Sequence, residues 1–143
     1  MMRKADFDLT DPVVVLRLMC GLFYAPHILF KLGNMAGSAA FFGRVLPMGE
    51  VMLYLALAAE TACLIGLTLN ILTKWLGLVS AGIMAIALYA TLVTKGMGWL
   101  WNLGGVEYLV FWGVASVSLS VHAWKQERAR YGRVFLLMAP ARA

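Results

Sequence analysis

Charged residues are scarce in this sequence. Asp, Glu, Lys and Arg make up 13% of its 143 residues, whereas 62% are hydrophobic and the mean hydropathy is +0.82. A soluble domain is typically about 45–50% apolar and about 25% charged. The composition therefore excludes an ordinary soluble domain and indicates one small integral membrane domain.

Residues that usually bind metals and cofactors are also few. Cys20 and Cys63 both fall inside apolar runs, so they do not form the disulfide framework of a secreted domain, and we interpret them as packing residues. His27 and His122 are predicted at opposite ends of the molecule, too far apart to clamp one haem. There is no phosphate loop, dinucleotide fingerprint, zinc-type His-Glu pattern or CxxC motif. We expect no haem or metal site in this chain alone.

What the sequence has instead is long apolar runs. Four of them approach the ~20 residues that a helix needs to cross a ~30 Å hydrocarbon core. They are Val13–Phe30, Val51–Ile71, Trp75–Val93 and Val106–Trp124. The runs are continuous rather than alternating, which disfavours a transmembrane barrel. We predict an all-α membrane protein, a four-transmembrane-helix antiparallel bundle over residues 13–124, between an N-terminal segment, residues 1–12, and a basic tail, residues 125–143.

The basic residues predict the orientation of this bundle. Eight flanking Lys and Arg lie in the N-terminal segment, the short link around residues 73–74 and the tail, and three lie on the opposite side. Because basic residues are retained on the cytoplasmic side, both termini should be cytoplasmic. The net charge of +5 belongs mostly to the tail, where it favours contact with anionic lipid over nucleic acid. Arg17, Pro26 and His27 interrupt the first run, so we expect a retained span rather than a signal peptide.

Two connections and one proline predict further local structure. The stretch 31–49 is too apolar for a free loop, and we expect a short half-buried helix over the outer mouth of the bundle. The stretch 94–105 combines glycines with Trp99 and Trp101, which suits tight backbone at the membrane interface. Pro26 removes a backbone donor and should bend the first helix beside His27.

Three charged residues lie within the apolar runs: Arg17, Glu60 and Glu107. A charge at the membrane centre costs roughly 2.5–3.5 kcal/mol on insertion scales, so such residues usually face the bundle interior and mark a site. At ~1.5 Å rise per residue, Arg17 and Glu60 come to depths that their long side chains bridge. We expect a deep Arg17–Glu60 ion pair. Such a pair alternatively serves only to fix the helix register.

A second group of polar residues is predicted near the outer surface. His27, Lys31 and Glu107 come to similar depths there, and together they predict a polar cluster at the outer mouth. Two plainer readings stay open: Lys31 snorkels to the interface, and His27 only satisfies backbone groups freed by Pro26.

Several short motifs, in this order, carry a family resemblance. They are Leu16-Arg17, then Pro26-His27 with Lys31 and Gly33, then Ala59-Glu60 with Gly66, then Gly104-Gly105-Val106-Glu107. With them the chain resembles, from Val13 to Ala123, the DoxX family of small four-helix membrane proteins, which includes the DoxD-type subunit of thiosulfate:quinone oxidoreductase. At the end of the fourth run, Ser118–His122 replaces the Gly-x-Gly pattern of many members.

The resemblance implies a multi-pass protein of the bacterial inner membrane. It implies an integral membrane subunit of a quinone-linked oxidoreductase complex, with membrane lipid and another protein subunit as partners and no nucleic acid. In that role Arg17, Lys31 and Glu60 would line the quinone site together with His27 and Glu107. His27 or Glu107 would exchange protons with the quinone, while Arg17 would hold Glu60 ionised. The alternative is a non-enzymatic membrane anchor or assembly subunit, whose polar core only holds the bundle together.

Overall fold

The computed structural model describes residues 4–137, and within them all regular structure is helical. The elements are η1 (Lys4–Phe7), α1 (Pro12–Leu22), α2 (Tyr24–Gly33), α3 (Met35–Val45), α4 (Gly49–Thr68), α5 (Thr73–Lys95), η2 (Trp101–Leu103) and α6 (Glu107–Tyr131). The predicted all-α fold is confirmed. The tail predicted from residue 125 begins inside α6, which continues to Tyr131.

Three helical segments of the described chain are long and apolar enough to cross a membrane. They are Pro12–Gly33, which is α1 together with α2, Gly49–Thr68 and Thr73–Lys95. The protein is therefore a multi-pass membrane protein. Helix α6 is 25 residues long but is not one of the three, because its uncharged stretch, residues 108–124 between Glu107 and Lys125, is short and also contains three serines and His122. The fourth crossing and the cytoplasmic termini stay predictions.

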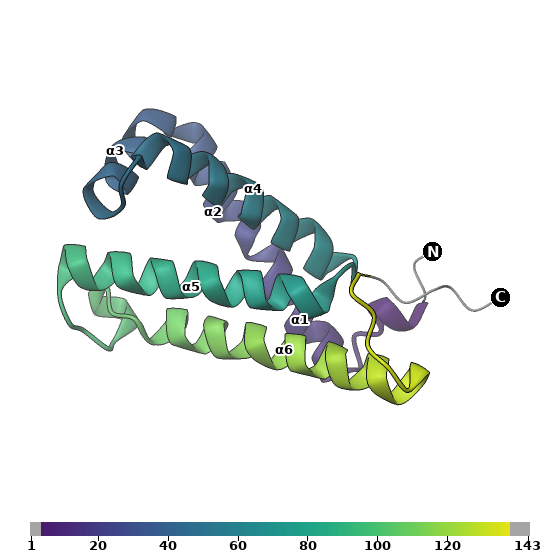
Figure 1. The fold of residues 1–143 in the computed structure, drawn as a ribbon. Helices are drawn as coiled ribbons and strands as arrows, with labels where there is room; N and C mark the ends of the chain where they lie inside the picture. Colours follow the sequence, from purple (N-terminus) through teal and green to yellow (C-terminus); the bar gives the residue numbers. More distant parts are fainter. Residues whose placement is uncertain (1–3, 138–143) are drawn as a thin grey trace.

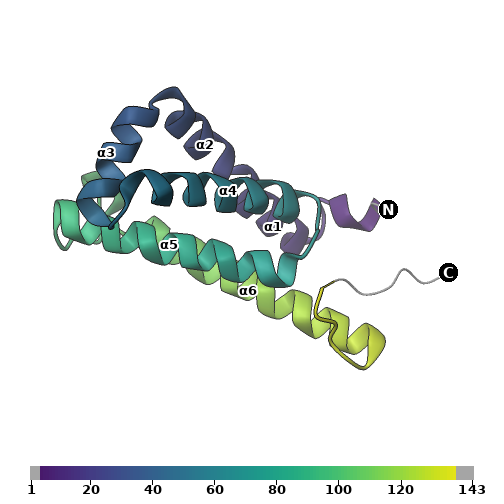
Figure 2. The same cartoon turned by 45° about the horizontal axis from the view of Figure 1, so that its top comes forward.

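The helices form two layers. Helices α5 and α6 run antiparallel side by side in one layer, and α1 to α4 form the other (Figures 1 and 2). A Cβ atom at Gly77 would lie 2.6 Å from the carbonyl oxygen of Ser116, so this glycine lets α5 and α6 approach closely. The predicted antiparallel hairpin between α4 and α5 is confirmed. We call the end of the molecule with this link, residues 69–72, the hairpin end, and the opposite end the α3 end.

The first span is broken into two helices in the turn before Pro26, whereas the sequence predicts a bend beside His27. Helix α1 ends at Leu22 and α2 begins at Tyr24, with Phe23 between them. A proline has no N–H to donate to the carbonyl four residues earlier, and its ring crowds that carbonyl. For Pro26 this carbonyl belongs to Leu22. The break therefore falls in the turn before Pro26 and not beside His27.

The apolar connection between the first two spans is a helix, as predicted. Helix α3 begins after Asn34, whose side-chain oxygen accepts a hydrogen bond from the backbone N–H of Gly37 at 3.1 Å. It packs on α4, and the two backbones approach closely at Gly49, where a Cβ atom would lie 2.4 Å from the nitrogen of Gly43. This contact holds α3 as part of the layer that contains α4.

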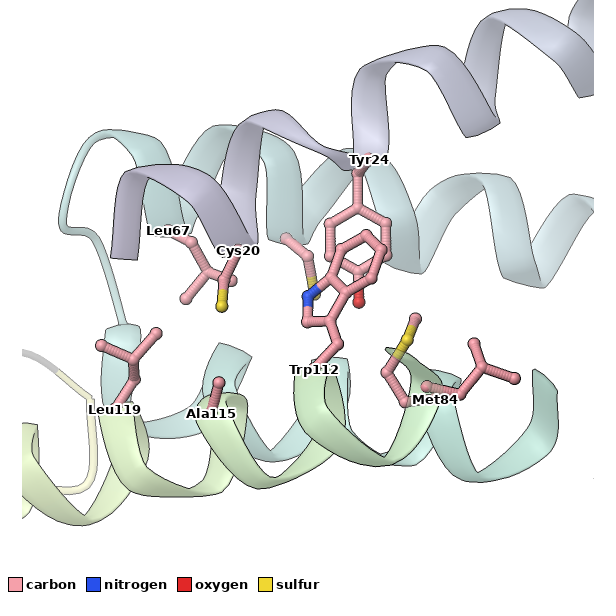
Figure 3. Packing of buried hydrophobic residues seen from close by; sticks show 9 residues of the cluster. Cys20, Tyr24, Leu67, Met84, Trp112, Ala115 and Leu119 are labelled. Carbon is pink, nitrogen blue, oxygen red and sulfur yellow. The ribbon is translucent and has the colours of Figure 1, made fainter. Parts of the chain in front are cut away.

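A buried core joins the two layers. Its residues are Cys20, Tyr24, Cys63, Leu67, Met84, Leu109, Trp112, Ala115 and Leu119 (Figure 3). Both cysteines are free and buried within it, as expected for packing residues. From the hairpin, α4 and α5 spread apart toward the α3 end (Figure 1).

Candidate functional site

A cavity of about 760 Å³ lies between the two layers. Helices α2, α3 and α4 line one side of it, and α5 and α6 line the other. Most of the lining residues are apolar or aromatic. The side of the cavity formed by α2, α3 and α4 includes six polar or ionisable residues: Tyr24, His27, Lys31, Asn34, Ser38 and Glu60. A concave, mostly apolar cavity of roughly 300–1,000 Å³ with a few polar groups is typical of a small-molecule site.

An ion pair between Lys31 and Glu60 lies in the wall of this cavity. The Nζ atom of Lys31 is 2.8 and 2.9 Å from the two carboxylate oxygens of Glu60, and the side chains are 15% and 7% exposed. Helical side chains lean toward the N-terminus of their own helix. Because α2 and α4 are antiparallel, Lys31 leans toward the hairpin end and Glu60 leans toward the α3 end. The two side chains therefore lean toward each other.

The expected Arg17–Glu60 pair is wrong. The Arg17 guanidinium donates to the backbone carbonyls of Leu67, Thr68 at 2.8 Å, and Asp6. Leu67 is seven residues beyond Glu60, or ~10 Å along the helix, and Arg17 leans toward the N-terminus of α1, away from Glu60. Arg17, which is 4% exposed, instead satisfies carbonyls that the C-terminus of α4 leaves without helical partners.

His27 lies one turn before Lys31 and lines the same cavity. Its ring lies against Trp112 of α6, with 5.9 Å between the ring centroids, and Trp112 also contacts the ring of Tyr24 at 4.8 Å. Among the described residues, the imidazole nitrogens of His27 have no hydrogen-bond partner. The imidazole is therefore free to bond a molecule in the cavity.

Glu107 is not among the residues that line the cavity. It is the first residue of α6 and is partly buried, whereas its neighbours Tyr108 and Leu109 do line the cavity. Tyr108, Leu109 and Trp112 all line the cavity from α6, and at about 100° of rotation per residue Glu107 falls outside the face that they share. Of the predicted outer cluster, the structure brings together His27 and Lys31, adds Glu60, and leaves Glu107 outside.

Sequence reasoning missed a chain of hydroxyl groups behind the cavity wall. The Tyr24 hydroxyl lies 2.7 Å from Ser80 Oγ, and Ser80 Oγ lies 2.8 Å from Ser116 Oγ. All three residues are essentially unexposed, and they join α2, α5 and α6. In the sequence, Tyr24 lies on the same helical face as Lys31, which only weakly indicates that its hydroxyl has a polar partner. A single serine in an apolar helix gives no indication of its partner.

Comparison with known proteins identifies the family. No curated protein and no solved structure matches the chain. The family model of DoxX matches residues 13–94, from α1 through α5, a stretch that contains His27, Lys31 and Glu60. The segment Gly104–Glu107 and the whole of α6 lie beyond the matched residues. Because the match covers more than half of its length, the chain belongs to the DoxX family.

Proposed function

We propose that the protein is an integral membrane subunit of a quinone-linked redox complex in the bacterial inner membrane, and that the cavity between its layers binds the quinone. The observation that carries this proposal is the cavity itself. It is about 760 Å³ in volume, mostly apolar, and bordered by an ion pair and an imidazole within a membrane protein. Another subunit would supply the electrons.

The size of the cavity fits a quinone with part of its tail. Water occupies ~30 Å³ per molecule in the liquid, so 760 Å³ equals the volume of roughly 25 waters. That is more than a quinone ring fills. Phe30, Leu55 and Ile86 line the cavity and are 72%, 57% and 51% exposed. In a bilayer these side chains face lipid, which gives an isoprenoid tail a route out of the cavity.

The polar groups of the cavity fit the quinone ring. A quinone presents two carbonyl oxygens, which need hydrogen-bond donors. Lys31 directs two N–H groups at Glu60, and its third donates a long hydrogen bond, 3.5 Å from Nζ to oxygen, to the backbone carbonyl of His27. A ligand carbonyl would take the place of that weak acceptor. The imidazole of His27 supplies another donor. Arg17 and Glu107 are left out of the proposed site, because the first is bonded to backbone carbonyls and the second does not line the cavity.

A bound quinone takes up two electrons and two protons to become a quinol. The protein's own residues have three tasks in that reaction. His27 orients the ring and passes a proton at an imidazole nitrogen. Lys31 holds the carboxylate of Glu60 in place beside the ring, and the apolar walls keep water out. His27 would deliver the two protons one after the other and take each up again from solvent at the membrane surface, while the partner subunit supplies the two electrons.

The test is replacement of His27 in the native complex. His27→Ala should abolish quinone-linked electron transfer without lowering the amount of assembled protein. His122→Ala is the matched control, because the other histidine does not line the cavity. Full turnover by an assembled His27→Ala complex would remove the proposed role of the cavity.

A non-enzymatic anchor or assembly subunit is the second candidate. It is favoured by the way buried polar groups bond to one another across helices, as Lys31 does with Glu60 and Arg17 does with the end of α4. Such contacts fix helix packing without any ligand. Purification from native membranes separates the two functions. A stoichiometric protein partner without quinone indicates an anchor, and bound quinone indicates the redox subunit.

A further inference from the structure

A cavity that is open to a bilayer meets an abundance of competing ligands. Phospholipids and fatty acids are apolar chains with a polar headgroup, so they have the general form of the proposed ligand. The exposed rim residues Phe30, Leu55 and Ile86 offer all of these molecules the same apolar entrance. Discrimination among them must therefore come from the polar groups inside.

The fixed charges of the cavity cancel. Among the described residues that line it, Lys31 and Glu60 are the ones of the types Asp, Glu, Lys and Arg. Both carboxylate oxygens of Glu60 accept from the same ammonium group, at 2.8 and 2.9 Å. The pair is largely shielded from solvent, at 15% and 7% exposure. The cavity thus offers no unbalanced charge to a ligand.

We propose that the Lys31–Glu60 pair makes the cavity selective for uncharged amphiphiles and excludes anionic ones such as fatty acids and anionic phospholipids. An anionic headgroup that approaches Lys31 has to displace Glu60 and leave that carboxylate unpaired in an apolar surrounding, which is costly. An uncharged carbonyl or amide bonds to His27 and, in place of the long bond to the backbone carbonyl of His27, to the third N–H of Lys31, while the pair stays intact. The inference rests on the cavity of the proposed function but does not require the ligand to be a quinone.

Removing the carboxylate charge should reverse the selectivity. Glu60→Gln keeps the shape of the side chain but leaves the ammonium of Lys31 without a counter-charge. An apolar cavity with one unpaired cation is a site for a tailed anion. The double variant Lys31→Met/Glu60→Gln has no net charge again and should regain the preference of the wild type.

The experiment compares two probes with the same ten-carbon tail, decanamide and decanoate. Equilibrium binding is measured on the full chain in phosphatidylcholine nanodiscs at neutral pH. The wild type should bind decanamide at least about tenfold more tightly than decanoate, and Glu60→Gln should prefer decanoate by at least about tenfold. Glu50→Gln is the matched control, because Glu50 lies on the same helix but is exposed and does not line the cavity. It should keep the wild-type ratio.

Equal binding of the two probes by the wild type would overturn the inference, as would an unchanged ratio in a folded Glu60→Gln variant. If that variant does not fold, the wild type and the double variant still decide, because both must prefer decanamide. The outcome is separable from the proposed function. A protein that binds decanamide selectively but binds no quinone supports this inference and contradicts the proposed function. A protein that turns over quinone but binds both probes equally supports the proposed function and contradicts this inference.

Discussion

Lys31 and Glu60 should be energetically coupled, whereas Arg17 and Glu60 should not. Removing one partner of a buried ion pair costs roughly 3–5 kcal/mol in soluble proteins. Polar contacts between membrane helices are worth less, about 0.6 kcal/mol on average and ~1.7 at most, because the reference state in the membrane also finds partners. The 2.8 Å pair, with side chains 15% and 7% exposed, lies between these cases. We expect a coupling energy of about 1–3 kcal/mol.

Two double-mutant cycles measure this coupling. Reversible unfolding in mixed micelles is followed for Lys31→Met, Glu60→Gln and the double variant, and then for Arg17→Met with Glu60→Gln. In the first cycle the double variant should lose less free energy of unfolding than the two single variants lose in sum. In the second the effects should add to within ~0.5 kcal/mol, because the side chains bind different groups ~10 Å apart along α4. Additive effects in the first cycle, or equal coupling in both, would refute the assigned partners.

Three further predictions concern packing, the hydroxyl chain and orientation. Gly77→Val should destabilise the fold by about 1–3 kcal/mol in the same unfolding assay, because a Cβ atom there lies 2.6 Å from the carbonyl of Ser116; a neutral effect would mean that α5 and α6 are not so close. Tyr24→Phe should cost about 1–2 kcal/mol, since Ser80 loses a buried partner, and no loss of stability would count against the hydroxyl chain. A thiol reagent added outside the cell should label a cysteine placed at Gly98 and miss one at Gln126, and the opposite pattern would invert the predicted orientation.

Apolar run lengths were sufficient to predict most of the fold. They located the three membrane-spanning segments and the helix inside residues 31–49, because burial in lipid leaves the backbone few alternatives to a helix. They also predicted the tight hairpin between α4 and α5, but its link is residues 69–72, and the predicted residues 73–74 lie in α5. Proline chemistry predicted a disruption near Pro26. The exact turn depended on the crowded carbonyl of Leu22, which is a local steric detail. For α6, serines among the apolar residues weaken the signal, and its crossing is still a prediction.

The ion-pair partners were beyond what residue depth can predict. Counting residues along an axis places Arg17, Lys31 and Glu60 within reach of several partners. The direction in which each side chain leans then decides among them, and that depends on which helices are antiparallel neighbours. Lys31 therefore binds Glu60, while Arg17 binds the end of α4. The place of Glu107 outside the cavity depends on the rotation of α6, which the sequence pattern does not fix.

If the cavity between the two layers binds a quinone, a side chain that fills the cavity should remove the quinone. A Cβ atom built at Gly82 or at Gly33 meets no other atom within 4 Å, but of these two helical glycines Gly82 alone lines the cavity. The measurement is the quinone extracted per protein after purification of the wild type, Gly82→Phe and Gly33→Phe from native membranes. We expect equal amounts of quinone in the wild type and Gly33→Phe and almost none in Gly82→Phe. Equal quinone in all three proteins, or none in the wild type, would contradict it.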